Sequence, residues 1–127
     1  MPDNDPKITM HLETDAQGNP AVVGGDAKHH YKVVFEVENA PPDTYAATFK
    51  LDPSYYDPVR TLQPERDGRF RLETTTFGDF PLIVKLPRAN AQDVELTEGV
   101  ARGLKRARGS MPANPEVDAA LAEIADN

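Results

Sequence analysis

Two short loops hold the residues whose types and spacing are best suited to binding chemistry. "PSYYDP" places Ser54, Tyr55 and Tyr56 between two prolines, and "TTFGDF" places Phe77 directly before Gly78. Proline fixes the backbone and glycine permits a sharp corner, so we expect two rigid aromatic loops, which lowers the entropic cost of binding. Planar rings can stack on flat, uncharged groups. The alternative interpretation is structural, with a tyrosine packed as a lid on the fold and Phe77 as a plug at its rim.

The other polar residues specify no reaction. Asp52, Asp57 and Asp79 fall at loop positions, where carboxylates usually cap turns or face solvent rather than pair for acid-base work. Ser54 and the threonines of Thr74–Thr76 have no evident base nearby in the sequence. Because no reactive pair is indicated, we expect no enzyme activity.

Metal and cofactor sites are also not indicated. The chain has no cysteine, which excludes disulfides, thiolate nucleophiles and cysteine metal sites. His11, His29 and His30 are the only imidazoles, and adjacent residues of a strand point to opposite faces, so His29 and His30 would not chelate one ion. No glycine-rich phosphate loop or dinucleotide motif is present. We therefore expect neither a metal nor a cofactor.

Length and charge narrow the classes of partner. At 127 residues with 39% hydrophobic residues, the chain is expected to fold around one core. The formal net charge of -7 argues against nucleic acid as a partner, because binding phosphates requires a clustered positive surface. An acidic surface instead favours a basic segment of another protein. The start lacks the pattern of a secretory signal, and no stretch has the roughly 18 apolar residues of a membrane span, so we expect a cytoplasmic protein without membrane contact.

Alternating hydrophobicity predicts the body of the fold. A period of two indicates strands over residues 7–13, 31–39, 44–52, 59–63, 69–75 and 80–86, and an opening hairpin over residues 7–23. Prolines, glycines and acidic residues separate these runs at intervals typical of a β-sandwich. The pattern therefore predicts an all-β domain over residues 7–96, after a polar tail of residues 1–6.

Residues 97–127 are expected to form a helical C-terminal appendage. The first helix has Thr97 as a candidate cap and a basic cluster around Arg106, but Gly99 and Gly103 each weaken a helix by about 1 kcal/mol. The basic cluster could equally serve contacts within a larger assembly.

The second helix has a clearer pattern. Asn114 is its expected cap and Pro115 its first residue. Its apolar stripe consists of Val117, Ala120, Leu121 and Ile124. This stripe must lie on the sandwich, on a second copy of the chain or on a partner.

Two of the patterns together are similar to those of a known family. The run from Tyr31 to Leu86 contains "LDPSYYDPVR" at the end of an expected strand and, later, the corner "FGDF". The order of these elements and the gap between them resemble the YEATS domain family, and its prokaryotic branch most closely. The resemblance implies an immunoglobulin-like antiparallel β-sandwich in a bacterial protein, in agreement with the strand pattern.

The resemblance also implies a ligand site. Members that read histone tails sandwich the flat amide of an acylated lysine between two aromatic rings, while a loop serine and backbone groups hydrogen-bond to it. By position, Ser54 supplies the hydroxyl, Tyr55 and Phe77 supply the rings, and the backbone of Thr76, Phe77 and Gly78 supplies donors. Such a site selects an uncharged planar amide against a hydrated ammonium.

Two positions depart from the histone readers. Asp52 stands where those readers carry a histidine that supports the loop serine, and its carboxylate can accept a hydrogen bond from Ser54. Thr76 stands where they have a glycine, and its branched side chain could narrow the channel.

Two functional hypotheses follow from these patterns. The first is a non-catalytic recognition module that binds an acylated-lysine-like or peptide ligand in an aromatic groove at one end of the sandwich. The second is a structural adaptor without acyl-lysine binding, which docks through a sheet edge or through contacts of Val117, Leu121 and Ile124 with a second copy or a partner. The first predicts exposed rings beside a groove, and the second predicts collapsed loops and a free apolar patch or strand edge.

Overall fold

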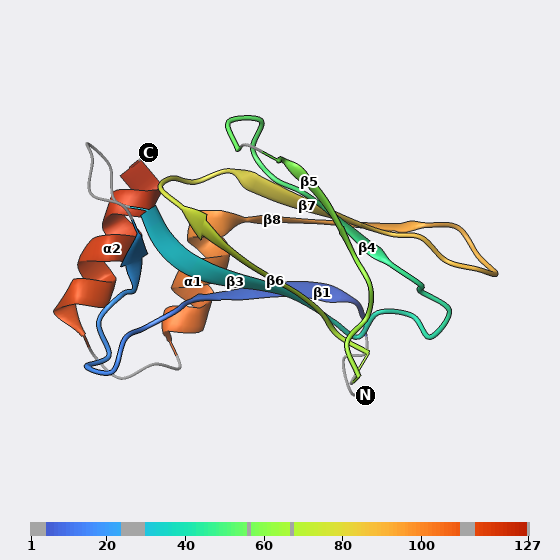
Figure 1. Cartoon of the computed structure of the whole chain (residues 1–127), viewed down its shortest axis with the longest axis horizontal. Helices are drawn as coiled ribbons and strands as arrows, with labels where there is room; N and C mark the ends of the chain where they lie inside the picture. The colour runs from blue at the N-terminus through green and yellow to red at the C-terminus, as the bar shows by residue number, and fades with distance from the viewer. Residues whose placement is uncertain (1–4, 24–29, 56, 67, 110–113, 127) are drawn as a thin grey trace.

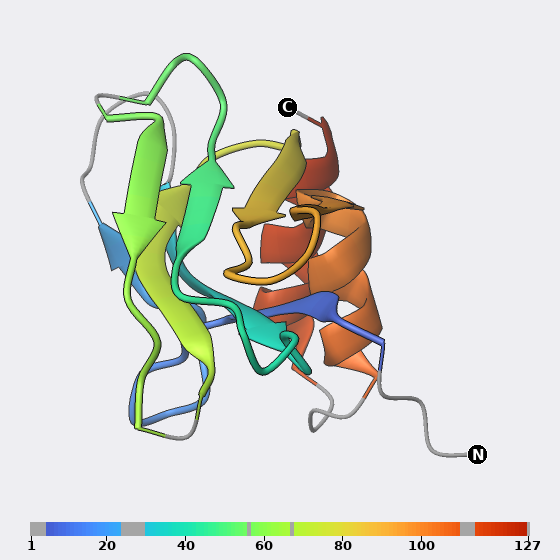
Figure 2. The same ribbon diagram turned by 90° about the vertical axis from the view of Figure 1, so that its right-hand side faces the viewer.

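The computed structural model describes residues 5–23, 30–55, 57–66, 68–109 and 114–126. They form two antiparallel sheets that pack face to face, with two helices packed together at one side (Figures 1 and 2). The strands are β1 (Lys7–Leu12), β2 (Val22–Val23), β3 (His30–Glu38), β4 (Ala47–Lys50), β5 (Val59–Leu62), β6 (Phe70–Thr76), β7 (Pro81–Leu86) and β8 (Val94–Gly99). The helices are α1 (Val100–Arg108) and α2 (Pro115–Asp126).

The first sheet is built around β3. β6 pairs with one edge of β3, and β1 and β2 follow one another along its other edge. The expected opening hairpin is therefore reduced to a small loop between Thr14 and Pro20, and β2 extends the line of β1 instead of pairing with it. The Ala21 N–H donates to the Glu13 carbonyl at the point where the chain returns to β3.

The second sheet has the order β5-β4-β7-β8. β8 extends to Gly99, with Thr97 opposite Ile83 in the ladder, so the expected helix cap at Thr97 is wrong and α1 begins at Val100. The first N–H groups of α1 instead find partners in the two residues that precede β7. The Val100 N–H donates to the Phe80 carbonyl at 3.0 Å, and the Ala101 N–H donates to the Asp79 carboxylate at 2.9 Å.

One hydrophobic core lies between the sheets and beneath the helices. Both sheets contribute the alternate residues of their strands, among them the fully buried Phe35, Phe49 and Val84. The helices add Val100, Leu104, Val117, Ala120 and Ile124 to the same cluster. The helical segment is therefore part of the hydrophobic core and packs more closely on the sandwich than an appendage would.

The apolar stripe of α2 faces this core. Val117 and Ile124 are 1% and 0% exposed, and Leu121 is half-buried against the cluster. Of the three expected alternatives, the stripe therefore packs on the sandwich of its own chain, and the burial of Val117 and Ile124 leaves neither side chain exposed to a second copy or a partner. Asn114 caps α2 as predicted, since its Oδ1 accepts the Glu116 N–H at 2.8 Å.

A glycine allows α1 to approach β1. Gly103 is buried, and a Cβ atom at this position would lie 2.7 Å from the Met10 sulfur. The side chain of Met10 thus occupies the space that any larger residue at position 103 would need. The glycine that weakens the helix in isolation is therefore favoured by its packing, because a larger residue would force the buried Met10 side chain to shift.

Replacing Gly103 with alanine should therefore destabilise the protein. The gain in helix propensity of about 1 kcal/mol is outweighed by overpacking of about 1 to 3 kcal/mol, which leaves a net loss of about 1 kcal/mol. Urea denaturation of the variant measures this, with Arg102→Ala on the exposed face of α1 as a control that should change little. A gain in stability for Gly103→Ala would contradict the packing.

A tyrosine joins α2 to the first sheet. The Tyr31 hydroxyl donates to the Glu123 carboxylate at 2.6 Å, and the Tyr31 side chain is only 6% exposed. Burial, the hydrogen bond to Glu123 and the charge of that carboxylate raise the pKa of Tyr31 to about 12. Since Tyr31 lies opposite Thr76 in the β3–β6 ladder, this bond also lies next to the end of β6.

The raised pKa predicts a loss of stability at alkaline pH. In the unfolded chain Tyr31 ionises near its ordinary pKa of 10.0, whereas in the folded protein its pKa is about 12. The contribution of the neutral Tyr31 side chain to folding stability is therefore complete below pH 10 and is lost as pH rises toward 12. Tyr31→Phe should cost about 1.5 to 3 kcal/mol at neutral pH and flatten this decline. Denaturant titrations at several pH values test this, with the exposed Tyr45→Phe as control. An unchanged alkaline decline in Tyr31→Phe would refute it.

Candidate functional site

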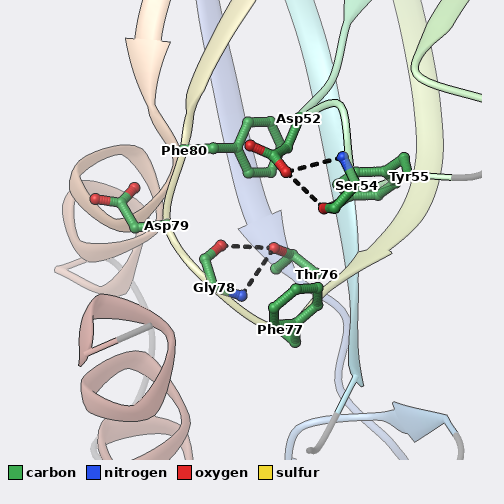
Figure 3. A pocket seen from close by; sticks show the side chains of 8 residues that line it. All are labelled: Asp52, Ser54, Tyr55, Thr76, Phe77, Gly78, Asp79 and Phe80. Carbon is green, nitrogen blue, oxygen red and sulfur yellow. Dashed lines mark hydrogen bonds between the residues drawn. The ribbon is translucent and has the colours of Figure 1, made fainter.

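The two aromatic loops meet at one end of the sandwich. The β4–β5 loop and the β6–β7 corner together line a cavity of about 190 Å³ (Figure 3). All six site residues predicted from the sequence border it, joined by Asp79 and Phe80; the six are Asp52, Ser54, Tyr55, Thr76, Phe77 and Gly78. Residues more than twenty positions apart in the sequence are thus brought around one space.

Asp52 organises the first loop. Its carboxylate accepts the Ser54 hydroxyl at 2.5 Å and the Ser54 N–H at 3.0 Å. The hydrogen bond from the Ser54 hydroxyl, with that from its N–H, holds the pKa of Asp52 below its ordinary value. Because the proton of the hydroxyl points to Asp52, the oxygen lone pairs of the exposed Ser54 can accept a hydrogen bond from a ligand.

Tyr55 is held from both ends. Its hydroxyl donates to the Thr75 carbonyl at 2.6 Å, and its ring meets the Phe80 ring at a centroid distance of 5.5 Å and an angle of 66°. Burial is the main cause that raises the pKa of Tyr55, so it is neutral near pH 7. The half-buried ring is therefore fixed against the core while it still lines the cavity.

Phe77 lies outside the core cluster. Its ring is half-buried, and its centroid lies 5.4 Å from that of the His30 ring at an angle of 49°. The ring borders the cavity, which leaves part of it open to solvent. Phe77 therefore differs from Phe80, which is 7% exposed and belongs to the core.

Thr76 and Gly78 form the turn beneath Phe77. The Thr76 hydroxyl, on a side chain that is 2% exposed, donates to the Gly78 carbonyl at 2.7 Å. The same oxygen accepts the Gly78 N–H at 3.4 Å, a long and weak bond. The threonine side chain is thus used to close the corner, as the dashed lines in Figure 3 show.

A second cavity adjoins the first. It has a volume of about 290 Å³ and shares Ser54, Tyr55 and Phe77 with its neighbour. Its other lining residues are His30, Arg60, Thr74 and Thr75. The two cavities thus adjoin at these three residues, and together they are called the groove below.

The sequence predictions omitted His30 and Arg60 from this site. His30 was considered only as a metal ligand, and its place beside Phe77 depends on the pairing of β3 with β6, which no local pattern reveals. Arg60 ends the run "LDPSYYDPVR", so its sequence position close to the aromatic loop was an available signal. Two other residues considered from the sequence, His29 and Tyr56, lie outside the described residues.

Within the described residues, no group of three or more histidine, cysteine or acidic side chains could hold a metal ion. In the same part of the chain, no helix has the length and apolar character needed to cross a membrane.

The two packed antiparallel sheets form an immunoglobulin-like β-sandwich, and a short helical segment follows it at the C-terminal side. Comparison with known protein families matches residues 31–98, more than half of the chain, to the prokaryotic YEATS domain. The chain therefore belongs to the prokaryotic YEATS domain family, as its loop motifs had suggested.

A solved structure agrees with this fold. The structure described as the Yaf9 YEATS domain recognizing an H3K122suc peptide is 20% identical to this chain, with a TM-score of 0.54, over 88% of this chain and 74% of that one. This similarity concerns the fold alone. Comparison with the curated proteins found no match.

The hydrogen bond from the Thr76 hydroxyl to the Gly78 carbonyl is expected to stabilise the folded protein. Thr76→Val keeps the shape of the side chain but leaves the buried Gly78 carbonyl without this donor, which should cost about 1 to 3 kcal/mol. Thr75→Val is the matched control, because Thr75 is half-buried in the same strand. Thermal denaturation of both variants measures the difference. Equal stability of the two would show that the hydroxyl is unimportant to the corner.

Proposed function

We propose that this chain is a non-catalytic recognition module that binds an acylated-lysine-like or peptide ligand in the groove. The observation that carries the proposal is that Ser54, Tyr55 and Phe77 border both cavities. A ligand lying across this end of the sandwich would meet all three residues at once. Preformed loops lower the entropic cost of holding it.

The chemistry of these residues suits a planar amide. The half-buried rings of Tyr55 and Phe77 offer apolar surface for stacking, and the Ser54 oxygen can accept an amide N–H. An unmodified lysine would instead have to bring a hydrated ammonium between the rings, at a cost in desolvation. The site therefore favours an acylated side chain over an unmodified one.

Charge near the first cavity favours a basic target. Asp52 and Asp79 both line this cavity, and the chain as a whole has a formal net charge of -7. A peptide with basic residues beside the modified lysine would be attracted to this side of the groove, chiefly through a faster rate of encounter.

The site is better suited to binding than to catalysis. A serine next to a carboxylate could suggest a nucleophile and its base, but the lowered pKa of Asp52 makes this carboxylate a poor base for a hydroxyl. We therefore assign Asp52 the role of fixing the orientation of Ser54.

Family membership supports the proposal. The similar Yaf9 YEATS domain is described as recognizing an H3K122suc peptide, and the structural match extends over most of this chain. For this chain the ligand class is inferred from the side chains of its own groove.

The structural adaptor is the second candidate. Docking through the apolar face of α2 is disfavoured, because Val117 and Ile124 are buried. Docking through a sheet edge is supported by β5, an outer strand on which Val59 is 54% exposed. β5 has four residues, which gives an added strand few backbone groups to pair with.

The proposal predicts selective binding of acylated peptides. Titration of labelled protein with lysine peptides in unmodified, acetylated and crotonylated forms should shift the NMR signals of Ser54, Tyr55 and Phe77 only with the acylated forms. Such a site can be as weak as about 100 µM in Kd, which NMR detects. Phe77→Ala should remove most of the binding while costing less stability than the about 3 to 5 kcal/mol of a core phenylalanine.

Two variants serve as controls. Phe49→Ala, in the core, should show the full loss of stability, and Tyr45→Ala, an exposed aromatic at the other end of β4, should bind normally. If folded wild-type protein gives no shift with any acylated peptide, the recognition proposal fails and the adaptor hypothesis gains.

A further inference from the structure

The edge strands of the two sheets lie on two sides of the sandwich. On one side, α1 packs against β1 and β8. On the other side, β5 and β6 are the outer strands of their sheets, and Figure 2 shows this side turned away from the helices. The side formed by β5 and β6 is therefore the one at which a further strand could be added.

Hydrogen bonds establish which backbone groups of β6 face this side. Lys32 of β3 donates its N–H to the Ala21 carbonyl and accepts the Glu13 N–H, both at 2.9 Å, on the side of β1 and β2. Thr75 lies opposite Lys32 in the β3–β6 ladder, so these two residues form a pair without hydrogen bonds between them. The backbone N–H and carbonyl of Thr75 therefore point away from β3.

The aromatic loop gives independent support for this direction. The Tyr55 hydroxyl, which does not belong to this sheet, donates to the Thr75 carbonyl at 2.6 Å. Because backbone directions alternate in an antiparallel ladder, the groups of Arg71 and Glu73 face the same edge as those of Thr75. Within the described residues, the backbone of Arg71 and Glu73 forms no hydrogen bond at this edge. Each of the two residues thus offers an N–H and a carbonyl to an added strand.

The free edge of β6 leads into the groove. Thr74 and Thr75, near the end of the strand, line the second cavity together with Tyr55. Side chains of neighbouring strands share a face where their residues lie side by side. A peptide residue beside Thr74 would therefore direct its side chain to the face on which Leu72 is buried, which is the side of the cavity.

β6 is better suited to strand addition than β5. β6 has seven residues, whereas β5 has four and directly follows Pro58. The exposed side chains of Arg71 and Glu73 protect the β6 edge against pairing with apolar chains. Their mutual contact at 3.5 Å is a weak surface pair, so the Glu73 carboxylate, on a side chain that is 63% exposed, can still attract a basic peptide residue.

We propose that the ligand peptide adds to the free edge of β6 as an extended strand and thereby places its modified side chain in the groove. This inference rests on the proposed function and names how the partner is held. The peptide main chain pairs with the backbone of Arg71 and Glu73, while Tyr55 and Phe77 contact the modified side chain. The occupant is a peptide segment because the edge is continuous with the groove.

The first test follows the backbone amides of the wild-type protein. Saturation with a crotonylated lysine peptide should shift the NMR signals of the Arg71 and Glu73 amides and slow their exchange with solvent about tenfold or more, because a paired N–H exchanges only when the pairing opens. The amides of Val59 and Thr61 on β5 are the internal control and should keep their exchange rates.

The second test removes one donor from the edge. Glu73→Pro deletes the N–H that faces the edge and leaves the hydrogen bonds to β3 in place, so it should weaken peptide binding about twofold to tenfold. Glu73→Gln keeps the N–H and should weaken binding less than Glu73→Pro does.

Thr61→Pro is the matched control on β5. Pro58 accepts the Leu51 N–H at 2.6 Å, and Thr61 lies three positions further along, so the Thr61 N–H faces the free edge of β5 by the same alternation. This variant should bind the peptide as the wild type does.

Several outcomes would overturn strand addition. Unchanged exchange of the Arg71 and Glu73 amides in a complex that depends on Phe77 does so, and leaves the proposed function standing. Equal weakening by Glu73→Pro and Glu73→Gln also does so, because it assigns the effect to the carboxylate. Protection of the same amides at high protein concentration without peptide assigns the edge to a second copy instead. Absence of binding to every acylated peptide overturns both proposals. The exchange measurement decides the matter even if Glu73→Pro does not fold.

Discussion

The hydrogen bonds of the β6–β7 corner join three parts of the molecule. Thr76 closes the turn through Gly78, the Asp79 carboxylate and the Phe80 carbonyl accept the first N–H groups of α1, and the Phe80 ring enters the core. The chain changes sheets at this corner, so its geometry sets how the end of the sandwich is closed and where α1 begins. The same five residues, 76–80, all line the first cavity, which means that the groove is built on a segment the fold itself requires.

The helices belong to this arrangement. α1 packs on β1 through the close contact of Gly103 with Met10, and α2 is tied to β3 through Tyr31 and Glu123. Both helices bury their apolar residues in the cluster that the sheets form. The consequence for function is that the helical segment stabilises the fold, while the loops at the end of the sandwich are left to meet a ligand, as is common where a rigid framework holds variable loops.

The sequence predicted the strands and most of the site because those signals are local. Phe35, Phe49 and Val84 each belong to a series of apolar residues at every second position of a strand, and Asn114 and Pro115 mark a helix start by their own chemistry. Ser54, Tyr55 and Phe77 were marked by proline and glycine beside them. The start of α1 was misplaced because its partners come from Asp79 and Phe80, about twenty residues earlier. His30 was not assigned to the site because only the pairing of β3 with β6 brings it to Phe77.

By itself, the sequence determined the β-sandwich, the family and the two aromatic loops, since period-two alternation, turn residues and loop motifs act over a few neighbouring positions. Only the tertiary structure decided what the apolar stripe of α2 covers and which charges flank the groove. The stripe of α2 could pack on any apolar surface, and the core cluster of the sheets and α1 lies within reach in the same chain. The separation of Asp52 and Asp79 from Arg60 and His30 follows from strand pairing and sheet packing, which place residues by contact in space and not by order in the chain.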